Sequence, residues 1–371
     1  MHVRSLKLRN YRNYYELELA LQPGINIFLG PNAQGKTNVI EAIYYASLGH
    51  SHRTHLDAEL IRWDAAEGCI ILDFDRRGVA NHLEFQFSRA KRRRILLNGH
   101  PIRLKELIGS INTVLFSPED LFLIKGAPAG RRRFLDGEIS QASPAYYHEL
   151  IEFNRIISQR NMLLKRIRER RADTSMLPLW DEQLVTSAEK IVRKRLEAVR
   201  KLNMLANLMQ RRISSDQENL TVSYEIHGGE DMTKPFASWY NEMLRKSQET
   251  DILRGSTSYG PHHDDIVLTV NGINLRTFGS QGQQRTGVLS LKLAELEFLR
   301  SETGEYPILL LDDLFDKLDM GRVEQLIKLV SGEEFGQIVI TDCNKVRLET
   351  ILGRQGGDYR LYVVANGEIA K

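Results

Sequence analysis

The two ends of the chain carry short apolar or alternating runs that predict β-strands. In the N-terminal third, runs bounded by turn-forming residues predict five strands, at residues 3–8, 15–21, 25–30, 69–75 and 82–87. A helix is expected directly after the third of these, at residues 37–49. Asn98-Gly99, which follows an apolar run, has the composition of a hairpin turn.

The C-terminal part alternates strands and helices. After a helix that includes Thr286, the pattern predicts a buried strand, a helix, a strand and a hairpin, at residues 308–313, 320–330, 336–342 and 362–371. Asn271-Gly272 predicts one more hairpin turn. Alternation of strands and helices is typical of the α/β fold class, which we therefore expect.

The middle of the chain has a different period. Between Leu150 and Ile213, apolar residues recur at intervals of three and four, which predicts amphipathic helices. Pro178 lies between two runs of this pattern and should break or redirect the chain. Two helices of about 25 residues each would make an arm roughly 40 Å long. We predict an α/β body, residues 1–125 and 256–371, interrupted by a helical arm at 126–255, with both parts of the body completing one sheet.

Composition favours a folded protein of the cytoplasm. Hydrophobic residues make up 42% of the chain and charged residues 27%, as in ordinary globular proteins. No apolar run approaches the ~18–20 residues that a membrane span requires, and the N-terminus does not read as a secretory signal. The two cysteines, Cys69 and Cys343, flank apolar runs, and we expect buried, reduced thiols.

Positive charge is concentrated in the predicted arm. Between Arg155 and Arg212 there are fifteen Lys or Arg residues against six Asp or Glu residues. Because the whole chain carries only +3, the remaining residues are acidic on balance. A basic segment on an acidic body favours a polyanionic partner.

The segment GPNAQGKT, residues 30–37, matches the phosphate-binding pattern G-x-x-x-x-G-K-[ST] in full. It follows an apolar strand and opens a helix, where backbone N–H groups and the helix N-terminus attract phosphate. Lys36 should reach the β- and γ-phosphates of ATP, and Thr37 should hold Mg²⁺. The expected nucleotide contacts are Gly30, Pro31, Asn32, Ala33, Gln34, Gly35, Lys36, Thr37 and Asn38. A plain glycine-rich turn is the alternative.

The buried strand ILLLDD supplies the acidic groups that such a site requires. It ends on Asp312 and Asp313, at the expected mouth of the sheet. We expect Asp312 to orient Mg²⁺ together with Thr37, and Asp313 to position or deprotonate the attacking water. Lys36, Asp312 and Asp313 are thus the predicted catalytic residues, with ATP and Mg²⁺ as cofactors.

The segment GSQGQQ, residues 279–284, opens a helix. Ser280 and Gln283 fit a capping box, and a well-capped helix alone would explain them. A helix N-terminus with a serine hydroxyl and Gly282 is also an anion site. The P-loop already provides one anion site for the nucleotide of the same chain. We therefore expect the anion site at GSQGQQ to close over the γ-phosphate held by another copy of the chain. Asp316 and Asp319 are expected to pair across that interface.

Basic residues are candidate contacts to DNA phosphates. Those of the arm are Arg160, Lys165, Arg166, Arg168, Arg170 and Arg171. They spread around a helix, which suits backbone phosphates rather than base edges, although a solvated helix face is the alternative. A second basic run, equally consistent with a charged edge strand, is Arg92, Arg93 and Arg94. Because aromatic residues are not interleaved, we expect duplex or junction binding rather than single-strand stacking.

Several segments, spread over essentially the whole chain, resemble the RecF family of SMC-like ABC-type ATPases. They are LKLRNYRNY, GPNAQGKTNVIEAIYYASLG, SHRT, FSPEDLFLIKGAPAGRRRFLD, GPHHDD, GSQGQQRT and LLLDDLFDKLD. The resemblance implies an ABC-type ATPase head with a mixed sheet, carrying the inserted helical arm. The P-loop is general to many ATPases, whereas the later segments and their order are specific to the family.

The resemblance also implies roles and partners. Lys36 would be the Walker A lysine, Asp312 and Asp313 the Walker B pair, and Ser280 the signature serine. Asp316 and Asp319 would belong to the D-loop. Arg12 and Asn13 would lie against the nucleotide. Two molecules would sandwich two ATP molecules, bind double-stranded DNA and its junctions with single strands, and act with RecR and RecO to load the recombinase RecA in DNA repair.

The chain departs from these patterns at three positions. Asp313 stands where many ABC ATPases have glutamate, Asp342 where a switch histidine is usual, and His263 where the family motif would have arginine. The histidine-rich stretches 50–55 and 262–265 lack metal-ligand spacing, so we expect packing roles for them.

Two other functions are compatible with a P-loop. A soluble ABC subunit that energises a membrane transporter is disfavoured by the basic arm and by the positional match to RecF. A monomeric P-loop kinase would have no use for GSQGQQ.

Overall fold

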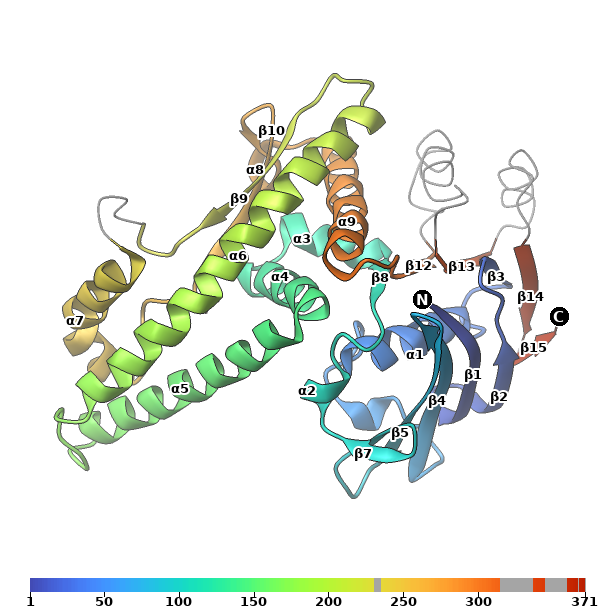
Figure 1. The fold of residues 1–371 in the computed structure, drawn as a ribbon, viewed down its shortest axis with the longest axis horizontal. Helices are drawn as coiled ribbons and strands as arrows, with labels where there is room; N and C mark the ends of the chain where they lie inside the picture. Colours follow the sequence, from blue (N-terminus) through green and yellow to red (C-terminus); the bar gives the residue numbers. More distant parts are fainter. Residues whose placement is uncertain (230–234, 314–335, 344–358, 366, 371) are drawn as a thin grey trace. The chain divides into compact units, whose positions relative to one another are not determined.

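The computed structural model describes residues 1–229, 235–313, 336–343, 359–365 and 367–370 (Figure 1). The chain forms two compact units. The first, here called the head unit, consists of Met1–Asp120 and Glu295–Lys371. The second, the arm unit, is Leu121–Ala294. The predicted helix at 320–330 lies outside the described residues.

One sheet of the head unit is made from both ends of the chain. Its strand order is β15-β14-β3-β13-β12-β8, and neighbours are parallel except β14 and β15. The strands are β3 (Ile25–Leu29), β8 (Thr113–Phe116), β12 (Ile308–Asp312), β13 (Ile338–Asp342), β14 (Tyr359–Ala365) and β15 (Glu368–Ala370). Every residue of β3, β12 and β13 is buried, as expected of parallel strands covered on both faces. The prediction that both ends complete one sheet is confirmed.

The second sheet of the head unit is antiparallel, in the order β2-β1-β4-β5-β6-β7. Its strands are β1 (His2–Tyr11), β2 (Tyr14–Ala20), β4 (Glu67–Arg76), β5 (Val79–Ser88), β6 (Arg94–Leu97) and β7 (His100–Ile102). Helix α1 (Lys36–Leu48) contacts strands of both sheets and is buried on most of its circumference. This packing explains why apolar residues of α1 are not confined to one stripe of the helix.

Four short elements complete the connections of the first 125 residues. They are η1 (Asp57–Glu59), α2 (Leu104–Leu107), η2 (Pro118–Leu121) and α3 (Phe122–Lys125). The predicted hairpin turn at Asn98-Gly99 joins β6 to β7 and is confirmed, with both residues at positive φ.

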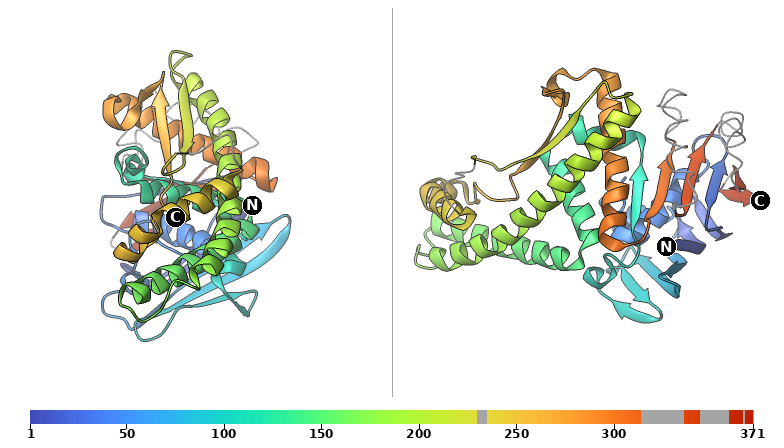
Figure 2. Two further views of the ribbon diagram at one scale, coloured as in Figure 1. Left: turned by 90° about the vertical axis from the view of Figure 1, so that its left-hand side faces the viewer. Right: turned by 45° about the horizontal axis from the view of Figure 1, so that its top comes forward.

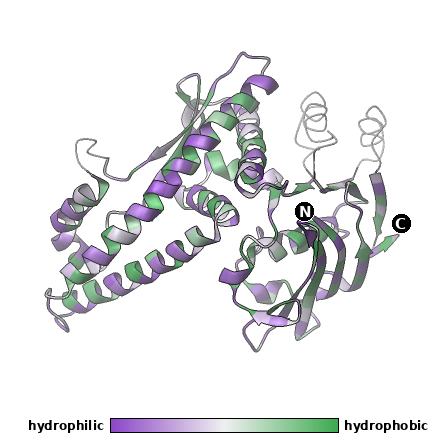
Figure 3. Cartoon of the chain, in the orientation of Figure 1, coloured by the Kyte–Doolittle hydropathy of each residue, from purple (hydrophilic) through white to green (hydrophobic). Residues whose placement is uncertain are grey.

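The arm unit is built around one long helix. Helix α6 (Leu177–Ile213) contacts α5 (Pro144–Arg168), α7 (Phe236–Arg254) and strand β9 (Leu220–Glu225), and the three views show it beside them (Figures 1 and 2). Green and purple alternate along α5 and α6, as in amphipathic helices (Figure 3). Helix α6 has 37 residues, longer than predicted, and Pro178 lies in its first turn, where proline is tolerated.

The sequence did not reveal a small sheet in the arm unit. Strand β10 (Asp265–Val270) pairs with β9 and with β11 (Ile273–Asn274). The Asn271-Gly272 turn is therefore a hairpin, as predicted, but it clusters with the arm unit instead of the body. The division into 1–125, 126–255 and 256–371 remains a functional prediction.

The remaining helices of the arm unit are α4 (Pro128–Ala142), α8 (Leu275–Phe278) and α9 (Gln281–Thr303), which ends in the head unit. Of the two cysteines, Cys69 is half-buried and Cys343 is exposed, and neither forms a disulfide. The expectation that both are buried is wrong, because each lies at a position beside the apolar run rather than inside the core.

Two buried arginines hold the arm unit together. The fully buried Arg160 donates to Asp181 at 2.6 Å and to Asp251 at 2.8 Å. Arg195, 2% exposed, forms two 2.9 Å hydrogen bonds with the carboxylate of Asp136. Removing one partner of such a pair leaves a buried charge uncompensated.

Arg160→Ala should therefore destabilise the arm unit by about 3–5 kcal/mol. Trp180 and Trp239 lie in the arm unit and Trp63 in the head unit, so urea unfolding followed by tryptophan fluorescence in a Trp63→Phe background reports on the arm. The exposed Arg168 on the same helix is the matched control, and Arg168→Ala should change stability by about 0.5 kcal/mol at most. Equal effects of the two substitutions would contradict this account.

Candidate functional site

The P-loop glycines stand where the main chain passes close to other atoms. The loop leads from β3 into α1, which begins at Lys36. A Cβ on Gly30 would lie 2.2 Å from the carbonyl oxygen of Val364. Gly35 has φ 113°, and a Cβ there would lie 2.7 Å from the hydroxyl of Tyr14. The fold therefore demands glycine at both positions.

Lys36 is buried inside the loop that precedes it. Its ammonium donates to the carbonyl oxygens of Gly30 at 2.7 Å and Pro31 at 3.0 Å, and the residue is 3% exposed. Carbonyl dipoles compensate this charge only in part, so the position attracts an anion.

The hydroxyl of Thr37 and the carboxylate of Asp312 meet at the edge of the parallel sheet. Thr37 Oγ1 donates to Asp312 Oδ1 at 2.9 Å, and Thr341 Oγ1 donates to the same oxygen at 2.7 Å. Asp313 follows at φ 42°, with its N–H bound to Thr341 Oγ1 at 3.0 Å. Hydroxyl and carboxylate oxygens are the ligand types that Mg²⁺ prefers, so Thr37 and Asp312 fit the predicted metal site.

Burial raises the pKa of Asp312 and is the largest effect, and the charge of Asp313 raises it too. The hydrogen bonds from Thr341 and Thr37 lower the pKa, but the net value lies above the ordinary one. Its negative charge is thus costly in the protein alone. A bound cation would remove that cost.

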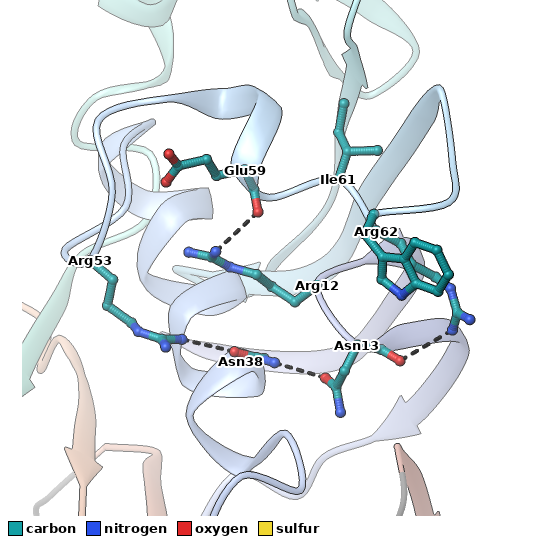
Figure 4. A pocket seen from close by; sticks show the side chains of 8 residues that line it. Arg12, Asn13, Asn38, Arg53, Glu59, Ile61 and Arg62 are labelled. Carbon is teal, nitrogen blue, oxygen red and sulfur yellow. Dashed lines mark hydrogen bonds between the residues drawn. The ribbon is translucent and has the colours of Figure 1, made fainter.

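A cavity of about 510 Å³ adjoins the P-loop (Figure 4). Its lining residues are Arg12, Asn13, Asn38, Arg53, Glu59, Ile61, Arg62 and Trp63. Figure 4 shows hydrogen bonds linking Arg53 to Asn38 at 2.9 Å and Asn38 to Asn13 at 2.7 Å. Asn13 in turn donates to the carbonyl oxygen of Gln34 in the loop, at 2.9 Å. The predicted contacts Arg12, Asn13 and Asn38 therefore lie together beside the phosphate loop.

A buried carboxylate anchors this cavity. Arg12 donates to both oxygens of Glu41, at 2.8 and 2.6 Å, and Ser51 donates at 2.5 Å. Burial raises the pKa of Glu41, whereas these hydrogen bonds and the nearby arginine charges lower it. The lowering effects together are larger, so the net pKa lies below the ordinary value. Glu41 therefore stabilises the fold above the pKa of an unfolded glutamate, and this contribution is lost as pH falls through the lowered pKa.

Sequence reasoning missed several cavity residues. Arg53 lies in the SHRT segment that carried the resemblance, so a signal for it was present. Nothing in the pattern marked Trp63, whose side chain is 83% exposed although it lines the cavity.

The GSQGQQ segment forms the capping box that its sequence predicts. The N–H of Gln283 donates to Ser280 Oγ and the N–H of Ser280 to Gln283 Oε1, each at 3.1 Å. Ser280 is exposed, and the carbonyl oxygen of Gly282 accepts from Thr286 at 2.9 Å. These residues lie in the arm unit and the P-loop in the head unit. Asp316 and Asp319 lie outside the described residues.

The structure corrects the predicted set of DNA contacts at Arg160. Because it is fully buried in ion pairs with Asp181 and Asp251, its guanidinium is not available to phosphates. The other predicted arm residues are exposed: Lys165, Arg166, Arg168, Arg170 and Arg171. In the second basic run Arg92 and Arg94 are exposed, whereas Arg93 is half-buried against Asp57 and the carbonyl oxygen of Gly49.

Comparison with known proteins identifies the family to which this chain belongs. The family model described as RecF/RecN/SMC N terminal domain matches residues 2–355. A DNA replication and repair protein RecF of Bacillus subtilis is 41% identical over 393 residues, covering 100% of both chains. Another, of Clostridium novyi, is 38% identical over 370 residues, covering 100% of this chain and 99% of the relative. The chain belongs to the RecF family.

Solved structures agree with this assignment. A structure of the recombination mediator protein RecF with ATP has a TM-score of 0.90 and 32% identity, covering 100% of this chain and 97% of that chain. An SMC head domain from Pyrococcus furiosus shares the fold, with a TM-score of 0.56 and 14% identity, covering 99% of this chain and 95% of the other. The predicted ABC-type α/β head is therefore confirmed. No helix among the described residues is long and apolar enough to cross a membrane.

Two segments that carried the RecF resemblance meet in the arm unit. Arg131 donates to both carboxylate oxygens of Asp265 at 2.7 Å, and Arg132 donates to the carbonyl oxygen of Asp264 at 2.8 Å. Arg131 is only 4% exposed, so its charge is held inside the arm unit rather than at the surface.

Because the raised pKa of Asp312 makes its charge costly, Asp312→Asn should stabilise the ligand-free protein at pH 8 by about 0.5–2 kcal/mol, the range of single stabilising substitutions. The difference should shrink as pH falls and the wild-type carboxyl becomes protonated. Differential scanning calorimetry measures both effects, and Glu67→Gln, at an exposed carboxylate in β4, is the control. With ATP and Mg²⁺ the order should reverse. An asparagine variant less stable than the wild type at pH 8 without ligand would refute the argument.

Proposed function

We propose that the protein is an ATP-dependent DNA-binding protein of recombinational repair and replication-fork maintenance. The observation that carries this proposal is the hydrogen bond between Thr37 and Asp312, which joins the two parts of a nucleotide-hydrolysing site in a member of the RecF family. A RecF structure with ATP and relatives named for DNA replication and repair support the nucleotide and the nucleic acid as ligands.

In the proposed ATP complex, Lys36 exchanges the P-loop carbonyls for oxygens of the β- and γ-phosphates. The cavity beside Arg12 and Asn13 receives the nucleoside. Thr37 and Asp312 would hold Mg²⁺, which would supply positive charge against the charge that develops during phosphoryl transfer. Asp313 positions the attacking water, and because aspartate is one methylene shorter than the usual glutamate, we expect a weak, DNA-stimulated ATPase.

Nucleotide binding is proposed to join two copies of the chain. The N-terminus of α9, with Ser280, Gly282 and Gln283, would lie over the γ-phosphate bound by the partner. Asp316 and Asp319 would then pair across the interface. In this scheme ATP closes the dimer, and hydrolysis acts as a timer that reopens it.

The closed dimer is proposed to clamp duplex DNA at gaps and single-strand/double-strand junctions in the cytoplasm, at the nucleoid. The exposed cations Lys165, Arg166 and Arg168 on α5, with Arg170 and Arg171 beyond it, would contact backbone phosphates. RecR and RecO are the proposed protein partners, with which the clamp would help to load a recombinase.

Ser280→Arg should abolish nucleotide-dependent dimerisation. Arginine adds bulk and charge at the proposed contact with the partner's nucleotide, whereas Ser280→Thr keeps the capping hydroxyl and should behave as the wild type. Sedimentation with Mg²⁺ and a non-hydrolysable ATP analogue measures the mass, and binding of a fluorescent analogue shows whether the P-loop still works. If the arginine variant also reaches twice the monomer mass, Ser280 is a helix cap only.

Replacing four cations together by glutamine should weaken DNA binding uniformly across sequences. The four residues are Lys165, Arg166, Arg168 and Arg170. The slope of log K against log salt should fall by about 3 to 4, since each of the four lost phosphate contacts contributes about 0.9. The control is Arg155→Gln with Lys190→Gln, because both residues are exposed but already paired with Glu152 and Glu149. Fluorescence anisotropy over a salt series provides the slopes, and equal slopes for both variants would place the DNA elsewhere.

A further inference from the structure

A second polar cavity lies entirely within the arm unit, apart from the P-loop. It has a volume of about 450 Å³ and lies between α7 and the loop of residues 255–263, here called the arm pocket. Lys246 and Arg254 line it from α7, and His227, Ser258 and His263 line it from the chain around the loop. Cationic, imidazole and hydroxyl groups thus dominate its donors.

The carboxylates next to the arm pocket are engaged by the interior of the arm. Asp251 accepts from Arg160 at 2.8 Å and from the N–H of Ser258 at 3.0 Å. Asp264 accepts from the hydroxyl of Tyr224 at 2.5 Å and from the N–H of His227 at 2.8 Å. The ion pair of Lys246 with Glu242 at 2.7 Å is exposed and therefore weak. An anion entering the pocket would meet donors with little competition.

The loop that forms one wall is held rigidly. Asn161 accepts from both the N–H and the hydroxyl of Thr257, at 2.8 Å each. The hydroxyl of Tyr240 donates to the carbonyl oxygen of Tyr259 at 2.9 Å, and Gly260, at φ 128°, lies so close that a Cβ would be 2.3 Å from that hydroxyl. A wall fixed in advance loses little entropy when a ligand binds.

Two groups in this wall retain unused hydrogen-bonding capacity. Ser258 Oγ is buried and has no partner among the described residues. His263 Nε2 lies 3.0 Å from the carbonyl oxygen of Thr257, which can only accept, so Nε2 carries a proton, and Nδ1 can donate to a phosphate oxygen only in the imidazolium form. A buried hydroxyl without a partner is costly and is satisfied when a ligand accepts from it.

The arm pocket also adjoins the basic end of α5. Arg168 Nη1 donates to the carbonyl oxygen of Arg254 at 3.4 Å, and a Cβ on Gly255 would lie 2.8 Å from Lys165 Cγ. The exposed cations Lys165 and Arg168 of α5 therefore adjoin the arm pocket at Arg254, which is one of its lining residues.

From these contacts we infer that the arm pocket is a second phosphate site, in which Lys246, Arg254, His263 and Ser258 hold one phosphate group. Continuity with α5 favours a phosphate of the DNA backbone as its source, and that part rests on the proposed DNA-binding function. Soluble inorganic phosphate is the other source of the same chemistry. The pocket would fix the position of the duplex on the arm without reading its sequence.

Titration of the full chain with inorganic phosphate tests the site without DNA. The ten histidines can be labelled at ¹³Cε1, and His227→Gln and His263→Gln assign the two signals of the arm pocket. Phosphate should shift both signals saturably in the wild type and in Arg245→Gln, an exposed neighbour on α7 that does not line the pocket. Lys246→Gln with Arg254→Gln should weaken this binding at least tenfold. If neither wild-type signal moves with phosphate, the inference is overturned.

DNA binding in the same variants identifies the source of the phosphate. For a backbone phosphate, the double variant should lower the slope of log K against log salt by about 1, while Arg245→Gln leaves it unchanged. An unchanged slope in a double variant that has lost inorganic phosphate assigns the site to soluble phosphate and overturns the DNA source. If the wild type binds phosphate here but no DNA, the proposed function fails and the phosphate site stands.

Discussion

The parallel pairing of β3, β13 and β12 is the constraint on which the nucleotide site depends. Its register sets Leu29 opposite Asp342 and Asp312 opposite Thr341, so the carboxyl ends of the three strands share one edge. The P-loop leaves that edge, and Thr37 in the first turn of α1 reaches Asp312. Since side chains alternate along a strand, a slip of one residue would turn Asp312 away from Thr37.

The arm unit obeys a different constraint, the burial of charge. Arg160 and Arg195 belong to a helix pair whose surface is basic, yet both are taken into the interior and neutralised by aspartates from other elements. The same contacts hold the loop of residues 255–263, because Arg160 also donates to the hydroxyl of Thr257 and Arg195 to the carbonyl oxygen of Pro261. Buried ion pairs thus order a loop that carries polar groups facing a cavity.

Helix α9 joins the arm unit to the head unit along the chain. It begins in the arm unit directly after Ser280, and its last residues belong to the head unit, shortly before β12 and Asp312. In the proposed mechanism a contact at Ser280 with a partner's nucleotide is therefore connected covalently, through one helix, to the strand that carries the acidic pair. The capping box at Ser280 and Gln283 stabilises the N-terminal end of this helix.

The sequence by itself determined most strands of the head, the P-loop, the acidic strand and the helix start at GSQGQQ, because each is set by local period, glycine placement or capping chemistry. It did not reveal β8, which pairs with β12. Periodicity located the arm helices but not the sheet of β9 and β10, whose pairing joins residues about forty to fifty positions apart. Only the tertiary structure decided which arginines face water: a charge count treats Arg160 and Arg168 alike, and the aspartates that bury Arg160 come from distant segments. The arm pocket was likewise undetectable from the sequence, since it is lined by residues that only folding brings together, whereas the family resemblance had already implicated Arg12 and Asn13 of the other cavity.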